Sequence, residues 1–173
     1  MDRSIIIRLS AGDRALMNRC AMAPGAPWLS RRVWIAVTHL GGTGPTLLAA
    51  GLPWFACCAL HQASRLALAS AILSHLLVQL VKRAVGRSRP AGDGCVALVR
   101  EPDRFSFPSG HATASMSVAI AYGVAFPVWA APVFLLAVLV GFSRIRLGVH
   151  YPSDVLVGQV IAVATSAALS VLL

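Results

Sequence analysis

The sequence predicts an all-α fold, an integral membrane helical bundle with about five to six transmembrane helices and an N-terminal interfacial helix. Hydrophobic residues make up 57% of the 173 residues and charged residues only 12%, with a mean hydropathy of +0.74. That charged fraction is about half the value of a typical soluble domain. Long apolar runs also alternate with short polar segments, and the length fits one domain, residues 1–173.

The formal net charge of +9 indicates the kind of partner to expect. A strongly basic protein can bind nucleic acid, but here the Lys and Arg residues are not interleaved with aromatic residues on a polar surface. They lie in short segments between apolar runs, as expected for contacts with anionic lipid head groups. We therefore expect the membrane bilayer as a partner and no nucleic acid.

Residues 1–30 are too rich in arginine to span a bilayer, and we expect them to lie along the interface as an amphipathic helix. Val33–Leu60 is the first long apolar stretch, and Gly41–Pro45 interrupts it. Two interpretations remain open for this stretch. It forms either a helix that dips in, a break and a span from about Thr46, or one tilted and broken span.

The rest of the chain alternates between apolar runs and polar segments. Residues 61–65 are expected to form a short polar turn, and residues 86–107 a longer loop rich in Gly, Pro and charge. The expected spans are Leu66–Val81, Ser109–Phe126, Val128–Phe142 and Val155–Leu173. Because successive spans alternate in direction, the polar segments 82–90, 105–111 and 143–154 should meet at one membrane face.

The first polar segment, residues 82–90, is rich in cations. Lys82 is expected at the C-terminal end of a helix, where the helix dipole favours a positive charge. Arg89 precedes Pro90 and should therefore lie in extended backbone. Such dense positive charge requires an anion, either lipid phosphates in general or one bound phosphoryl group. A plain juxtamembrane basic flank is the simpler interpretation of this segment alone.

The second segment brings Pro-Ser-Gly to the start of an apolar helix at Ser109 and Gly110. Exposed backbone N–H groups at the positive end of a helix form a phosphate site, and glycine lets the backbone approach the ligand closely. Ser109 either donates its hydroxyl to the ligand or only caps the helix. His111 lies in the first turn and could give a proton to a leaving oxygen.

The third segment contains a histidine with a carboxylate four residues later. Pro152 suits the first position of a helix, so Asp154 should lie in the first turn and His150 in the preceding loop. The carboxylate can then reach back to one ring nitrogen of His150, which leaves the other nitrogen free as a nucleophile. Arg144 offers a fork of donors that suits phosphate oxygens. The simpler alternative is a polar loop between two membrane helices, capped by Asp154.

Together the three segments contain what phosphoryl transfer through a phosphohistidine needs: a nucleophile, a group that orients it, an acid and a charge clamp. Asp154 is the only carboxylate in these motifs. We therefore expect metal-free chemistry, with no metal site and no cofactor.

The combined pattern resembles the type-2 phosphatidic acid phosphatase superfamily, which also includes vanadium haloperoxidases and soluble bacterial acid phosphatases. The resemblance covers residues 66–173 and rests on Lys, six residues and Arg-Pro at 82–90, Pro-Ser-Gly-His at 108–111, and Ser-Arg, five residues, His, three residues and Asp at 143–154. It implies an all-helical bundle and a lipid phosphate substrate. It also implies that His150 is the nucleophile, Asp154 its partner and His111 the acid and base, with phosphate bound by Lys82, Arg89, Ser109, Gly110 and Arg144.

Three functions compete at this stage. The apolar spans favour a metal-independent membrane lipid phosphatase that acts on a lipid phosphomonoester or pyrophosphate of the polyprenyl diphosphate, phosphatidylglycerophosphate, phosphatidic acid or lipid A type. A vanadium-dependent haloperoxidase would use the same motifs, but those relatives resemble soluble proteins. A non-catalytic membrane scaffold would not need His150, Asp154 and His111 intact.

The expected location is the inner membrane of a bacterium, and the resemblance favours an active site on the periplasmic face. Charge opposes this if Val33–Leu60 spans once, because the N-terminal arginines and Arg31 and Arg32 then share the face of the active site. The positive-inside tendency would place that face in the cytoplasm. A second span within this stretch would remove the conflict.

Overall fold

The computed structural model describes residues 3–93, 95–101 and 103–172. The predicted domain has Met1 and Leu173 as its first and last residues, and both lie outside the described residues. The α-helices are α1 Arg3–Cys20, α2 Trp28–His39, α3 Thr43–Gly51, α4 His61–Val85, α5 Gly110–Ala125, α6 Pro127–Arg146 and α7 Pro152–Ser170. Short 3₁₀ segments occupy Leu52–Phe55, Cys58–Leu60 and Pro90–Asp93. The described chain contains no β-strand beyond an isolated bridge between Ser88 and Phe105.

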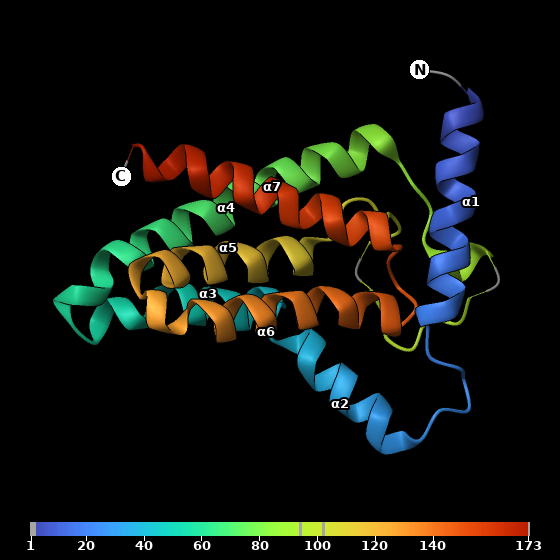
Figure 1. The fold of residues 1–173 in the computed structure, drawn as a ribbon, viewed down its shortest axis with the longest axis horizontal. Helices are drawn as coiled ribbons and strands as arrows, with labels where there is room; N and C mark the ends of the chain where they lie inside the picture. Colours follow the sequence, from blue (N-terminus) through green and yellow to red (C-terminus); the bar gives the residue numbers. More distant parts are fainter. Residues whose placement is uncertain (1–2, 94, 102, 173) are drawn as a thin grey trace.

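The four helices α4 to α7 run side by side along the long axis of the molecule, and α1 lies across one end of them (Figure 1). The α4–α5 and α6–α7 connections lie at this same end. The sequence predicts this convergence of the polar segments from the alternation of spans. The structure confirms it, because Arg87 before α5 contacts Ser153 at the start of α7.

A face of small residues lets α4 pack closely against its neighbours. The buried positions of α4 are Ala63, Ser64, Ala67, Ser70, Ala71, Ser74, Val78 and Lys82, spaced three or four residues apart. Small side chains on one stripe allow helices in a membrane to approach closely, and hydroxyl groups can bond across the contact. Ser74 Oγ accordingly lies 3.2 Å from Ser117 Oγ of α5. The exposed face of α4 is leucine-rich, as lipid contact requires.

The contact between α5 and α7 depends on Gly158. A Cβ atom at this position would lie 2.6 Å from the carbonyl oxygen of Ser109 and 2.7 Å from Thr113 Oγ1. Any larger side chain would force α7 away from the start of α5. Gly158 therefore fixes how closely the two helices that carry Asp154 and Ser109 approach each other.

Residues 33–60 run along the bundle from one end to the other, with a break between α2 and α3. At the end that carries α1, Trp34 of α2 lies beside Arg146, with the guanidinium 5.7 Å from the ring centroid. At the other end, Ala50 of α3 accepts a hydrogen bond from Tyr122 Oη at 3.3 Å. The helix breaks at Leu40–Gly42, which overlaps only the start of the interruption expected at Gly41–Pro45, because α3 already begins at Thr43. This path fits the single broken span, and the number of membrane crossings in this stretch stays a prediction.

The prediction of a polar turn at residues 61–65 is wrong, because α4 begins at His61. The His61 ring stacks on Trp54 with centroids 4.6 Å apart, and Ser64 Oγ lies 3.1 Å from Tyr122 Oη. Tertiary contacts thus satisfy polar side chains within the first helical turns.

The all-α membrane class is confirmed at a coarse level. Within the described residues, three helices are long and apolar enough to cross a membrane: α4, α6 and α7. The α5 helix has 16 residues and α3 only nine. The count of five to six spans is therefore not established by helix length and composition.

Candidate active site

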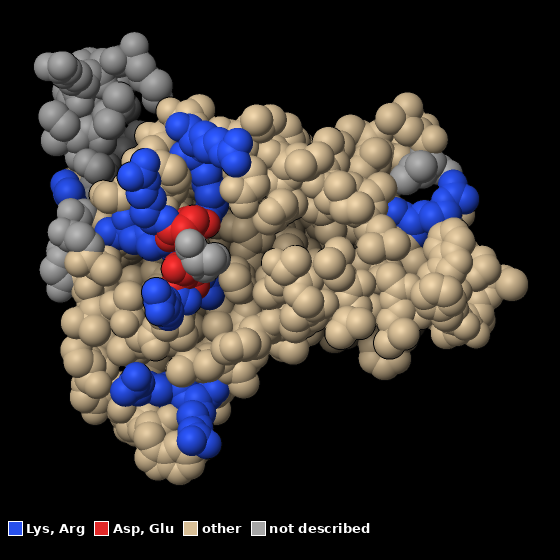
Figure 2. Space-filling model, turned by 180° about the vertical axis from the view of Figure 1, so that it is seen from behind, with Lys and Arg blue, Asp and Glu red and all other residues tan. Residues whose placement is uncertain are grey.

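The charged side chains gather at the end of the bundle that carries the loops. Figure 2 shows Lys, Arg, Asp and Glu side chains close together at this end, while the long middle of the same face shows none. A cavity of about 330 Å³ opens here and is lined by Lys82, Gly110, His111 and His150 among others. Four of the eight predicted site residues therefore line one cavity.

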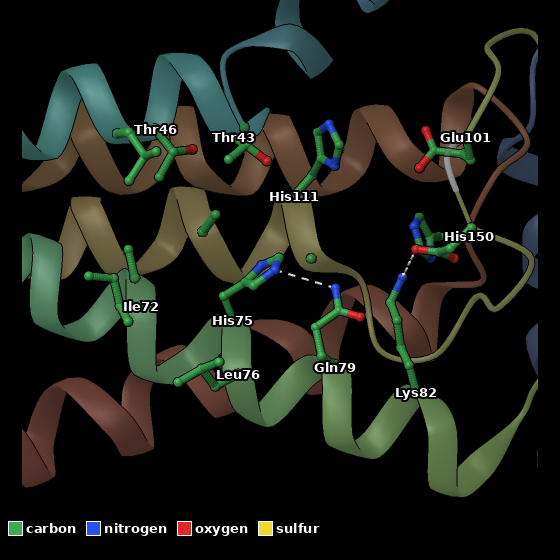
Figure 3. Close-up of a pocket in the computed structure, with 16 residues that line it drawn as sticks. Thr43, Thr46, Ile72, His75, Leu76, Gln79, Lys82, Glu101, His111 and His150 are labelled. Atoms are coloured by element: carbon green, nitrogen blue, oxygen red, sulfur yellow. Dashed lines mark hydrogen bonds and ion pairs between the residues drawn. The ribbon is translucent and has the colours of Figure 1, made fainter.

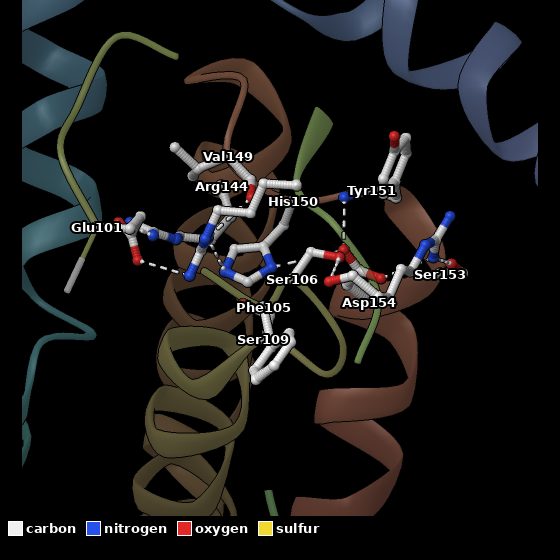
Figure 4. A network of polar contacts seen from close by, with 12 residues as sticks. Glu101, Phe105, Ser106, Ser109, Arg144, Val149, His150, Tyr151, Ser153 and Asp154 are labelled. Carbon is white, nitrogen blue, oxygen red and sulfur yellow. Dashed lines mark hydrogen bonds and ion pairs between the residues drawn. The ribbon is translucent and has the colours of Figure 1, made fainter. Parts of the chain in front are cut away.

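His150 lies in the α6–α7 connection with 1% of its surface exposed. Its Nε2 atom lies 3.3 Å from Arg89 Nη1, and a guanidinium nitrogen can only donate a hydrogen bond. Its Nδ1 atom lies 3.5 Å from Asp154 Oδ2 (Figure 4). This arrangement assigns the proton to Nδ1 and the lone pair to Nε2. The nitrogen that could attack phosphorus therefore points toward the cations.

Gly148 shapes the loop that presents His150. Its φ is +77°, a conformation that glycine adopts without steric cost. A Cβ atom here would also lie 2.4 Å from the carbonyl oxygen of Val96. Leu98 N donates to Leu147 O at 2.9 Å, so the loop before α5 packs directly on the histidine loop.

Asp154 is fully buried at the start of α7 and is held from three directions. Its Oδ2 accepts a hydrogen bond from Tyr151 N at 2.8 Å, and its Oδ1 accepts one from Arg87 at 2.7 Å. Tyr151 has extended backbone and Pro152 begins the helix, as predicted. The carboxylate thus both caps α7 and faces His150, so the two interpretations of Asp154 are compatible.

The same Arg87 guanidinium reaches the N-terminal helix. Its Nη2 donates to Asp13 Oδ2 at 2.7 Å, and Ser153 N donates to Asp13 Oδ1 at 3.0 Å. Met17 of α1 is buried against Ala112, Ile145, Tyr151 and Val155. Helix α1 is therefore docked on the site by both apolar and ionic contacts.

The three predicted phosphate-binding cations are paired with carboxylates of the α4–α5 connection. Lys82 Nζ lies 2.7 Å from Asp103 Oδ2, and Arg89 Nη2 lies 2.8 Å from Asp103 Oδ1. Arg144 Nη2 is paired with Glu101, while its Nη1 donates to Thr38 Oγ1 at 2.5 Å. These carboxylates satisfy donors that a phosphate group would otherwise engage.

The start of α5 offers further donors. Ser109 has extended backbone at the N-cap position and its side chain makes no capping hydrogen bond. Its buried hydroxyl has no partner among the described residues. Of the two roles considered for Ser109, the simple helix cap is thus not observed. The N-terminal backbone of α5, at Gly110 and His111, faces the same cavity.

Electrostatics favours an uncharged His150. Burial, followed by the positive charges of Arg144 and Arg89, holds its pKa well below the ordinary value. Partial burial alone would raise the pKa of Asp103, but its hydrogen bond to Lys82 and the nearby positive charges lower it overall. At neutral pH the site therefore combines a neutral His150 imidazole with an ionised Asp103 carboxylate.

All eight residues singled out from sequence lie in this cluster, either on the cavity or in contact with residues that line it. Sequence reasoning missed Asp13, Thr38, Arg87, Glu101 and Asp103. Glu101 and Asp103 left a signal as the carboxylates of a basic loop close to the second motif, and Arg87 as one of the cations of segment 82–90. Asp13 and Thr38 lie outside the three segments and meet the site only through the fold.

An all-helical membrane protein with a buried histidine–aspartate pair at a cationic pocket is the class that this fold and site define. The PAP2 superfamily model matches residues 63–173. The chain belongs to this superfamily.

Named relatives support the assignment. The chain is 40% identical over 103 residues to decaprenylphosphoryl-5-phosphoribose phosphatase from Mycobacterium tuberculosis, covering 57% of this chain and 55% of that protein. It is 32% identical over 167 residues to phosphatidylglycerophosphatase B from Bacillus subtilis, covering 87% of this chain and 77% of that protein. The chain spans about half the length of the first of these relatives.

A solved structure shares the fold. The transmembrane PAP2-type phosphatidylglycerolphosphate phosphatase from Bacillus subtilis superposes with a TM-score of 0.69 at 25% identity. The superposition covers 92% of this chain and 85% of that one. The likeness therefore extends beyond the family-matched region to the helices that precede it.

Proposed function

We propose that this protein is a membrane lipid phosphatase that works through a phosphohistidine on His150 and needs no metal. The observation that carries the proposal is the orientation of the buried His150 ring, with Nδ1 toward Asp154 and Nε2 toward Arg89. The names of the relatives, which are phosphatases of lipid phosphates, support the same reaction class.

In the first step, His150 Nε2 attacks phosphorus. A P–N bond forms as the P–O bond to the lipid breaks, and His111, which takes up a proton when the anionic phosphate binds among the cations, gives that proton to the departing oxygen. Asp154 stabilises the positive charge that develops on the His150 ring. Lys82, Arg89 and Arg144 would hold the phosphoryl oxygens, together with the hydroxyl of Ser109 and the backbone of Gly110.

In the second step, water attacks the phosphohistidine. His111, now neutral, takes a proton from the water, the P–N bond breaks and phosphate leaves. Both histidines return to their starting states. Since each step uses only groups already gathered around the cavity, no metal is assigned a role.

The substrate is a lipid phosphomonoester or pyrophosphate whose tail stays in the bilayer. The apolar helices support this, because the cavity lies at one end of helices that are apolar enough to cross a membrane. Polyprenyl diphosphate, phosphatidylglycerophosphate, phosphatidic acid and lipid A phosphates are the candidate substrates.

Phosphate release from these lipids with EDTA present tests the proposal. Wild type should release phosphate, and His150→Ala should not. His61→Ala is a matched control, since His61 lies at the far end of α4 from Lys82, and it should retain activity. Loss of activity in EDTA would contradict a metal-free mechanism. No release from any of these lipids would overturn the proposal and favour the scaffold alternative.

We also propose the inner membrane of a bacterium as the location, with residues 1–30 along the interface. The family resemblance favours the periplasmic face for the site. The single broken span supports the opposite face, because it leaves Arg14, Arg19 and the Arg31–Arg32 pair at the end of the active site. Labelling an Arg100→Cys variant in intact cells with an impermeant thiol reagent, in a background without the natural cysteines, decides between them. Labelling of the introduced cysteine supports the periplasmic face. Absence of labelling supports the cytoplasmic face.

A further inference from the structure

The cavity at the active site continues into a groove between α3 and α4. Figure 3 shows Thr43 and Thr46 on one wall and His75 and Gln79 on the other, with His111 between them and Lys82 and His150 at the far end. All of these residues line the same cavity of about 330 Å³. The groove therefore starts where phosphate would bind and runs along α4, away from the polar end of the molecule.

A polar stripe on α4 leads away from Lys82. Gln79 and His75 lie three and seven residues before Lys82 and therefore share its face. At 1.5 Å per residue, His75 lies about 10 Å deeper along the helix than Lys82. The exposed side chains around them on this part of α4 are apolar: Ile72, Leu73, Leu76, Leu77 and Leu80. Polar and ionisable groups within a membrane helix are expensive and face a cavity or a partner.

The two stripe residues contact each other and retain further capacity. Gln79 Nε2 lies 3.4 Å from His75 Nε2. Among the described residues, no other hydrogen bond is made by either side chain. The Gln79 carbonyl oxygen and the second His75 ring nitrogen can therefore serve a ligand in the groove.

Thr46 on the opposite wall gives an independent indication of a ligand. Its side chain is 4% exposed, lines the cavity and has no hydrogen-bond partner among the described residues. Other threonines in the bundle bond to the carbonyl of the preceding turn: Thr113 to Ser109 O at 2.8 Å and Thr165 to Ile161 O at 2.9 Å. A buried unpaired hydroxyl costs free energy unless a ligand satisfies it.

Building on the proposed function, we infer that this groove binds a hydroxyl-bearing group between the scissile phosphate and the lipid tail. The favoured substrates then carry their phosphate on a sugar or polyol and not directly on the lipid's hydrophobic part. A hydrocarbon chain in the groove would leave the Thr46 hydroxyl and the polar atoms of His75 and Gln79 unpaired. A site built to bond hydroxyl groups discriminates strongly against analogues that lack them.

Two lipids with identical acyl chains test this inference: phosphatidylglycerophosphate, with its phosphate on a hydroxyl-bearing glycerol, and phosphatidic acid, with its phosphate on diacylglycerol. Wild type should show the higher kcat/KM for the first. The variant His75→Leu with Gln79→Leu should lower that preference about tenfold or more, because kcat/KM should fall much further for phosphatidylglycerophosphate than for phosphatidic acid. Thr46→Val should shift the preference in the same direction.

Leu80→Ala is the matched control on α4, since this side chain is 63% exposed and does not line the cavity. It should leave the preference unchanged. An equal kcat/KM ratio in wild type and the double variant would overturn the inference. Failure of wild type to hydrolyse either lipid would instead count against the proposed function. Competition binding of the two lipids to a His150→Ala background, with and without the leucine substitutions, tests the groove independently of turnover.

Discussion

The carboxylates of Asp13 and Asp154, one on the first helix and one on the last, bind the same guanidinium. Arg87 lies 2.7 Å from Asp13 Oδ2 and 2.7 Å from Asp154 Oδ1. The Asp13 side chain is 8% exposed and that of Asp154 is fully buried, so water screens this bridge weakly. The orientation of the carboxylate that faces His150 therefore depends on α1.

Asp13→Asn should lower kcat about tenfold and change KM little, because the loss acts on the position of Asp154 and not on the lipid. Asp13→Glu should restore part of the activity. Steady-state kinetics on a lipid phosphate measures both constants. Asn18→Ala, at an exposed position of the same helix, is the control. A higher KM at unchanged kcat would contradict a positioning role for Asp13.

In the proposed mechanism, phosphate would have to displace Glu101 from its ion pair with Arg144. Removing its charge with Glu101→Gln should lower the inhibition constant for inorganic phosphate by about three- to tenfold, since the guanidinium no longer has to leave an ion pair. The same change leaves a buried cation without its carboxylate, so the melting temperature should fall. Product inhibition and thermal unfolding measure the two effects. Phosphate inhibition that is unchanged or weaker would show that Glu101 helps to build the site.

His150 should remain neutral well below pH 6.5, the ordinary midpoint of a histidine. Burial and the nearby arginines lower its pKa, and the neutral form would be the nucleophile in the proposed mechanism. The acidic limb of kcat/KM should therefore not begin at pH 6.5 through this group. NMR titration of the labelled ring in detergent micelles measures the midpoint directly. A His150 midpoint at or above 6.5 would refute the prediction.

Gly148→Ala should destabilise the fold by about 1–3 kcal/mol and reduce activity, because the positive φ and the close carbonyl of Val96 both oppose a side chain. Thermal unfolding in detergent and phosphate release measure the two effects. Gly12→Ala provides the opposite case. It lies within α1 with nothing near the added atom, and it should be neutral or stabilising. Equal stability of the two variants would contradict this account.

The sequence allowed the local parts of the site to be predicted. Pro152 predicts the helix start, and the four-residue spacing then brings Asp154 back to His150, as the structure has them. Alternation of the spans predicts that the three motifs meet. The first inference rests on the short-range geometry of a helix start. The second rests on the length that an apolar run needs to cross a bilayer, and both can be taken from the sequence.

Contacts between distant segments were not predictable in the same way. In the sequence, Asp13 is one acidic residue in a basic helix, and nothing nearby indicates its partner. Its hydrogen bond with Arg87 forms only because α1 lies across the end of the bundle. The start of α4 at His61 was missed because polar side chains indicated a turn, whereas Trp54 and Tyr122 satisfy them. Tertiary packing decided both outcomes.

The wide sequence separation of the site residues has a consequence for biosynthesis. Lys82 emerges from the ribosome long before Asp154, and the nucleophile is oriented only after α7 has inserted beside α5. A nascent chain halted before α7 would hold cations and donors but no oriented His150. In the proposed mechanism, catalysis would therefore begin only when the last helix is in place, and turnover would report complete membrane insertion.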